Sequence, residues 1–142
     1  MKTLICWTAL VSLHSLDALE IVIDRGNDNP TPIAIVPFAS SNSNGAVSGV
    51  ISFDLVRSGQ FSPLEEENML SYPSQPGDVY FRDWRVLGME YVLIGRHLDR
   101  LDGRVTVTYH LFDVSAEREV KSGEITAGRE RIRDITHRIA DE

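Results

Sequence analysis

The side chains that could do chemistry in this sequence are few and widely spaced. Its four histidines lack the His-x-His or His-Glu-x-x-His spacing that gathers ligands around one metal ion. His97 and His110 fall in expected strands and His137 in the last expected helix. At such positions a packed or surface histidine is the usual finding. We therefore expect no metal site and no cofactor.

Acidic residues and serines give no stronger indication of an enzyme. Residues 65–67 are three consecutive glutamates and residues 24–28 are rich in Asp and Asn, but neither has the alternate ligand spacing of a calcium loop. The serine in residues 45–49 is one place away from its position in a nucleophile elbow. Asp99 and Asp102, expected in a loop, are the carboxylate pair that a small hydrolase could use. We expect no catalytic residues, with that hydrolase as an alternative.

The charge of the chain argues against nucleic acid and lipid as direct partners. The formal net charge is −7; residues 19–90 carry ten acidic and four basic side chains, and residues 91–142 carry ten and nine. Nucleic acid and anionic lipid both require concentrated Lys and Arg. The one arginine cluster alternates with acidic residues, as on a solvated helix face: Arg129, Arg131, Arg133 and Arg138. We expect a monomer that reaches membranes only through protein partners.

The amino-terminal residues 1–18 have the pattern of a signal peptide. Lys2 precedes an apolar run from Leu4 to Leu13, and a small residue, Ala18, marks the expected cleavage site. The run is too short to cross a membrane, which needs about 20 residues. A buried core strand is the alternative. Cys6 is the only cysteine, so the mature chain would have no disulfide and no thiol chemistry.

Residues 19–30 are predicted to form a short strand and a polar hinge at the new amino terminus. Apolar side chains alternate at positions 19, 21 and 23, and Gly, Asn, Asp and Pro follow within residues 26–30. Such an extended strip can add to the exposed sheet edge of another protein. Its expected partner-binding residues are Leu19, Glu20, Ile21, Val22, Ile23, Asp24, Arg25 and Gly26.

Residues 31–142 alternate between strand and helix patterns, as in one α/β domain. A strand buried on both faces is expected at Ile33–Val36, and a helix from Gly45, capped by Ser43 or Asn44, is expected to stop at Ser58-Gly59. The expected elements that follow are a strand at 61–64, a surface connection at 71–78, a helix at 81–87, strands at 91–94, 105–111 and 118–126 with turns at Asp102-Gly103 and 115–117, and an amphipathic helix at 128–142. Trp84 and Tyr109 are expected in the core. The last helix lacks a stop signal, so we expect a longer parent protein.

The order of these segments resembles the amino-terminal domain of the TolB family. The resemblance covers the mature chain and rests on Ile21-Val22-Ile23-Asp24-x-Gly26, Pro32-Ile33-Ala34-Ile35-Val36-Pro37-Phe38, Asp54-Leu55-x-x-Ser58-Gly59-x-Phe61-x-Pro63-Leu64, Trp84-x-x-Leu87-Gly88-x-x-x-Val92-x-x-Gly95 and Tyr109-x-Leu111-x-Asp113. It implies a mixed sheet flanked by helices, with an architecture like that of anticodon-binding domains, that normally precedes a six-bladed β-propeller.

The resemblance also implies a function. TolB-like proteins are non-enzymatic periplasmic adaptors of the Tol-Pal system, which supports outer-membrane invagination at cell division and outer-membrane integrity. In the family the first mature residues, the TolB box, bind the periplasmic domain of TolA; the matching segment here runs from Leu19 to about Pro30, with Arg25 where Ser is commoner. Pal binding belongs to the propeller, so we expect none from this chain alone. The alternative is a stand-alone envelope-assembly module of the same fold that binds through a sheet edge.

Overall fold

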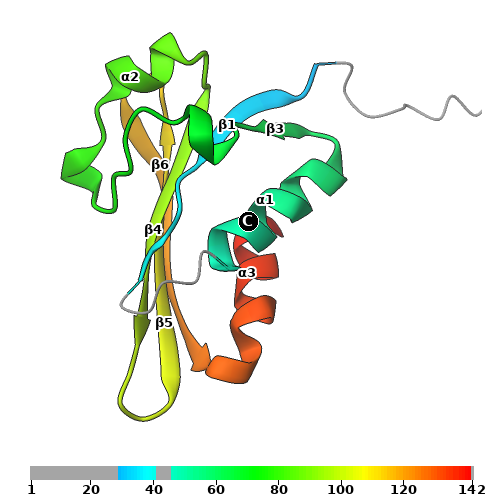
Figure 1. Cartoon of the computed structure of the whole chain (residues 1–142), viewed down its shortest axis with the longest axis vertical. Helices are drawn as coiled ribbons and strands as arrows, with labels where there is room; N and C mark the ends of the chain where they lie inside the picture. The colour runs from blue at the N-terminus through cyan, green and yellow to red at the C-terminus, as the bar shows by residue number, and fades with distance from the viewer. Residues whose placement is uncertain (1–28, 41–45, 142) are drawn as a thin grey trace, which may run out of the picture.

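The computed structural model describes residues 29–40 and 46–141. Several predictions therefore lie outside the described residues: the signal peptide at 1–18, the strip from Leu19 to Gly26, and the helix cap at Ser43 or Asn44. They remain predictions. Within the described ranges the chain forms a mixed α/β domain, as the sequence predicts (Figure 1).

One mixed sheet organises the domain, with the strand order β3-β1-β4-β5-β6. β1 (Thr31–Ile35) lies between β3 (Phe61–Pro63) and β4 (Tyr91–Asp99), parallel to both. The short β2 (Ala39–Ser40) pairs with the far end of β4. β5 (Arg104–Asp113) and β6 (Arg118–Gly128) continue the sheet in antiparallel pairing. All the strands predicted in this part of the chain are present, and β4, β5 and β6 are longer than predicted.

The helices lie on the two faces of this sheet. α1 (Ala46–Ser58) and α3 (Ile132–Asp141) pack side by side on one face (Figure 1). His137 Nδ1 and Asp54 Oδ2, 2.5 Å apart, join these two helices. The opposite face is covered near the β5–β6 turn by α2 (Phe81–Val86) and two single turns, η1 (Glu66–Asn68) and η2 (Pro76–Asp78).

Each face of the sheet has its own hydrophobic core. Ile33 and Ile35 of β1 point to the α1–α3 side, whereas Ala34 and Val36 point to the α2 side. This confirms that the first strand is buried on both faces. Trp84 is fully buried and Tyr109 is 4% exposed, which confirms both as core residues. Among the described residues, the buried members of the two cores run from Ile33 to Ile139.

Glycines make room for two large rings within the sheet. Gly95, Tyr109 and Gly123 are direct neighbours across β4, β5 and β6. The ring of Phe38 lies where a Cβ of Gly95 would be, and the ring of Tyr109 lies over Gly123. A glycine inside a strand commonly marks such a close approach. Gly95 and Tyr109, which belong to the last two motifs of the family resemblance, therefore have a packing role.

The start of the last helix is one prediction that the structure corrects. Gly128 pairs with Arg104 as the final residue of β6, so it belongs to the sheet and not to the helix. A single turn at Arg129–Arg131 follows, and α3 begins at Ile132, the first residue of the predicted apolar stripe. The pairing with β5 keeps the chain extended beyond the point at which local pattern favours a helix.

Candidate functional site

A groove of about 710 Å³ opens between the sheet and its two helices. Its floor is formed by Ile33 of β1, Leu93 of β4 and Leu111 of β5, which point to the face on which α1 and α3 pack. Leu55 of α1 and Ile139 of α3 form part of its walls. Apolar side chains from separate elements therefore meet in a concavity, which is the usual form of a binding site.

The groove lies where the amino-terminal segment joins the domain. Thr31, the first residue of β1, lines it together with Gln60 and Phe61. The Thr31 N–H donates to the Gln60 carbonyl at 2.8 Å, which fixes the chain at the groove rim. The first described residues of the chain therefore enter the domain beside the groove. The predicted binding residues, Leu19–Gly26, lie outside the described residues.

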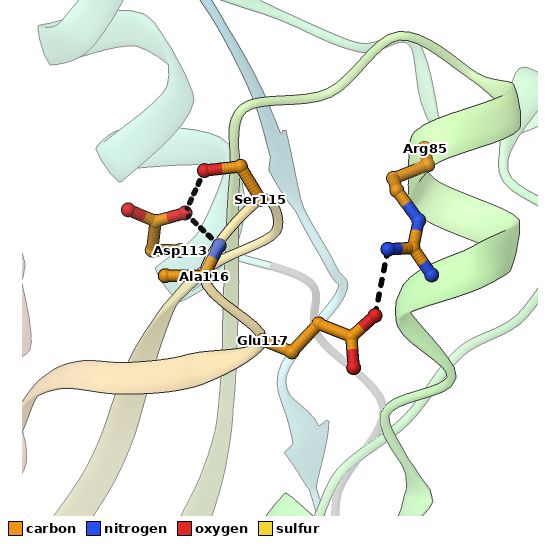
Figure 2. Close-up of polar contacts among 5 residues, drawn as sticks. All are labelled: Arg85, Asp113, Ser115, Ala116 and Glu117. Atoms are coloured by element: carbon orange, nitrogen blue, oxygen red, sulfur yellow. Dashed lines mark hydrogen bonds and ion pairs between the residues drawn. The ribbon is translucent and has the colours of Figure 1, made fainter.

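A well-ordered turn borders the groove at the β5–β6 end. Asp113, which lines the groove, accepts hydrogen bonds from the Ala116 N–H at 2.8 Å and the Ser115 hydroxyl at 2.7 Å (Figure 2). These bonds lower the pKa of Asp113, that from Ala116 contributing most. Glu117 has a positive φ of 51° and pairs with Arg85 of α2 at 2.6 Å. The turn is therefore held by hydrogen bonds within it and by an ion pair with α2.

Two further pairs of ionisable side chains lie on different parts of the fold. Glu119 accepts hydrogen bonds from Ser122 and from His110, both at 2.7 Å, and these bonds lower its pKa, that from Ser122 contributing most. Near the end of β4, His97 Nε2 lies 3.5 Å from Asp99 Oδ1. Within residues 29–40 and 46–141, no three His, Cys, Asp or Glu side chains are grouped as metal ligands would be.

The carboxylate pair of the hydrolase alternative is not assembled. Asp99 is the last residue of β4, not a loop residue, and its carboxylate contacts Arg129 at 3.0 Å. Asp102 lies in the following turn and accepts from the Arg104 N–H at 3.0 Å. The strand continues through Asp99 because β5 pairs with it in register, Asp99 opposite Val105. Each carboxylate therefore has its own structural partner.

The groove itself was not predicted from the sequence. Strand alternation identifies the residues that share a face, and helical spacing identifies the buried sides of α1 and α3. Neither pattern says which part of that face the helices leave uncovered. No helix of the described ranges is long and apolar enough to cross a membrane.

Comparison with known proteins gives a consistent result. A family model described as the TolB amino-terminal domain matches residues 19–120. The Tol-Pal system protein TolB of Pseudomonas aeruginosa is 42% identical over 137 residues, covering 94% of this chain and 32% of its own length. That of Pseudomonas entomophila is 37% identical over 145 residues, covering 100% of this chain and 33% of its own length.

Solved structures agree on the fold. TolB from Acinetobacter baumannii superposes with a TM-score of 0.69 at 29% identity, covering 83% of this chain and 28% of that chain. The LpoB carboxy-terminal domain from Salmonella enterica, at 12% identity and a TM-score of 0.55, covers 73% of this chain and 88% of that chain and shares the fold alone.

The fold and the groove define a class: a small α/β domain with a mixed sheet and an apolar groove between the sheet and two helices. The sequence comparisons narrow this further. The chain belongs to the TolB amino-terminal domain family. It spans about a third of the length of the two Pseudomonas relatives, since the matches cover 32% and 33% of them.

Proposed function

We propose that this chain is a periplasmic adaptor of the Tol-Pal system whose amino-terminal strip, Leu19–Gly26, binds the periplasmic domain of TolA. Through that contact it supports outer-membrane invagination during cell division and outer-membrane integrity. Export would remove residues 1–18 and make Leu19 the leading residue. Pal binding is expected only with the propeller of longer relatives.

One observation carries the proposal: the family match begins at Leu19 and continues to residue 120. The strip is thus within the matched region, and its start coincides with the expected cleavage site after Ala18. Its relatives are named as Tol-Pal system proteins. The structure adds a scaffold in which the described residues from Ile33 to Ile139 form two hydrophobic cores.

The binding mode that fits the strip is addition of a strand to a sheet edge of TolA. Main-chain hydrogen bonds would supply affinity, and Ile21 and Ile23, which share one side of an extended segment, would enter pockets. Each apolar side chain contributes about 1.5–3 kcal/mol when fully buried. A contact of this size is compatible with a Kd near 1 μM, about −8 kcal/mol.

A titration against the TolA periplasmic domain tests this proposal. A chain that begins at Leu19 should bind, and a chain that begins at Pro30 should keep the same thermal unfolding curve but not bind. Ile21→Asp with Ile23→Asp should abolish binding, whereas Glu20→Gln, on the other side of the strip, should leave it within about twofold. Undiminished affinity of the shortened chain would refute the mechanism.

A second candidate function uses β6. This strand pairs with β5 on one side, and no other described strand pairs with it. An edge of this length is a template for strand addition by another protein. In that case the domain would act as an envelope-assembly module through its sheet edge. Hydrogen exchange distinguishes binding through the amino-terminal strip from binding through β6. Partner-induced protection of amides in Arg118–Gly128, with none in residues 19–26, would favour binding through β6.

A further inference from the structure

The β4–β5 hairpin ends in a projection that combines exposed leucines with arginines. We call residues 96–104 the hairpin tip. Figure 1 shows the β4–β5 connection projecting beyond α3 at the end of the molecule opposite to α2. Leu101 in its turn is fully exposed and Leu98 is 48% exposed. Neither leucine is a member of the two cores formed by the described residues.

Three arginines of the hairpin tip accompany these leucines. Arg96, Arg100 and Arg104 are all exposed. Arg96 shares a sheet face with Leu98, and the register of Leu98 opposite Thr106 places Arg104 on that same face. The Arg100 N–H donates to the Arg104 carbonyl at 2.8 Å, which brings these two residues together across the turn. The structure gives none of the three a carboxylate partner within its described ranges.

The two acidic residues of the hairpin tip contact groups other than the three arginine side chains. Asp102 accepts from the Arg104 N–H within the turn, and Asp99 contacts Arg129 and His97 from the helix-covered face. Glu124 of β6 is the acidic side chain that shares the arginine face, in the row of Arg96. With its three arginines and two aspartates, the hairpin tip carries a net charge of +1. Arg100 Nη1 also donates to Thr106 Oγ1 at 3.4 Å, whereas the side chains of Arg96 and Arg104 have no hydrogen bond or ion pair among the described residues.

The opposite end of the molecule has the opposite charge. Residues 60–90, which include η1, η2 and α2, contain six acidic side chains and two arginines, a net charge of −4. Their acidic residues are Glu65, Glu66, Glu67, Asp78, Asp83 and Glu90. Figure 1 places this segment far from the hairpin tip. Near a negatively charged surface, such an asymmetry turns the hairpin tip towards that surface and the acidic end away from it.

We propose that the hairpin tip docks on the surface of an anionic phospholipid bilayer. Leu101 enters the boundary of the acyl chains, with Leu98 following, and Arg96, Arg100 and Arg104 bind headgroup phosphates. At about 3.3 Å per strand residue, Arg100 and Arg104 lie within roughly 10 Å of Leu101. This matches the depth of about 5–10 Å to which interfacial segments insert. Arginine binds phosphate through paired N–H groups.

The shape of the hairpin tip favours lipid over an acidic protein. Leu101 is fully exposed in the turn between β4 and β5. A bilayer surface accepts a projecting leucine and supplies phosphates beside it. The attraction is modest, about fivefold in affinity for each arginine near the surface. The contact therefore reinforces an adaptor held mainly by its protein partners.

Vesicle co-sedimentation tests this inference. The protein used begins at Leu19, because the apolar run from Leu4 to Leu13 would itself bind bilayers; this chain keeps all the described residues of both cores. We expect binding to vesicles of phosphatidylglycerol and phosphatidylcholine at low salt, weakening as salt rises, and none to phosphatidylcholine alone. Leu101→Ser should reduce partitioning about tenfold. Arg100→Gln with Arg104→Gln should reduce it about 25-fold.

Matched variants at the other end provide the control. Val86 and Arg82 are also exposed, so Val86→Ser and Arg82→Gln should leave partitioning unchanged. Leu101→Trp should show a blue shift of its emission on anionic vesicles. Equal binding by Leu101→Ser and by the starting protein, or no binding to anionic vesicles, would overturn the proposal. Binding to soluble polyglutamate without binding to vesicles would overturn it in favour of an acidic protein.

Discussion

Gly95 is the position at which one added methyl group tests the packing of the sheet most sharply. In Gly95→Ala the new Cβ would lie 2.4–2.6 Å from three atoms of the Phe38 ring, against 3.4–4 Å for ordinary contact. Phe38 is 6% exposed and packs in the core on the α1–α3 side. The ring must therefore move by about an ångström within a filled core, or the strand must bend.

The expected cost follows from that overlap. Overpacking a core costs about 1–3 kcal/mol, and the closeness of three ring atoms places Gly95→Ala at about 2–3 kcal/mol. For a domain of this size that lowers Tm by roughly 8–12 °C. Urea unfolding followed by far-UV circular dichroism measures the free energy of unfolding. The m-value should not change, because the folded and unfolded states expose the same surface as before.

Gly49 provides the matched control. It lies in α1 with nothing within 4 Å of its added Cβ. Gly49→Ala should stabilise the protein by about 0.5–1 kcal/mol, because a helix interior favours Ala. Phe38→Leu, which removes the ring, should make Gly95→Ala less costly than it is in the starting protein. A Gly95→Ala protein within 0.5 kcal/mol of the starting protein would refute the packing argument.

Three further predictions concern β6 and the turn that precedes it. The lowered pKa of Glu119 means that its charged form stabilises the fold above the ordinary value of 4.5 and that this contribution is lost as pH falls through the lowered folded pKa; Glu119→Gln should flatten the pH dependence of Tm in that range. Arg85→Ala breaks an exposed pair with Glu117 and should cost less than about 1 kcal/mol in urea unfolding, a larger loss contradicting the surface estimate. Gly123→Ala would place its Cβ 2.7 Å from the Tyr109 ring and should lower stability by about 1–2 kcal/mol, measured in the same way.

The sequence predicts the apolar parts of the fold well. β1 and β5 are recognised because their side chains alternate or are continuously apolar, and Gly59 and Gly88 adopt the left-handed conformation expected at the ends of α1 and α2. The second half of β4 was missed because Arg96, His97 and Asp99 do not read as a strand. They are extended because β5 pairs with each of them, which is a tertiary effect.

Because the second half of β4 was not predicted, the surface of the hairpin tip was not predicted either. With β4 ended at Ile94, the alternation of Arg96 with Leu98 could not be applied, and the arginines appeared as isolated charges. Their spacing of four, at 96, 100 and 104, was the available signal. The groove is different, since it depends on how α1 and α3 pack against the sheet, and no local pattern contains that information. The predicted strip from Leu19 to Gly26 remains a prediction.

The central claim is that residues 19–26 alone provide the contact with TolA, and a competition experiment tests it most directly. A synthetic Leu19–Gly26 peptide is added to the complex of the TolA periplasmic domain with the chain that begins at Leu19, and displacement is followed by fluorescence anisotropy. We predict full displacement by this peptide and none by the peptide with Ile21→Asp and Ile23→Asp. Failure of the unaltered peptide to bind TolA, while the whole chain binds, would contradict the account.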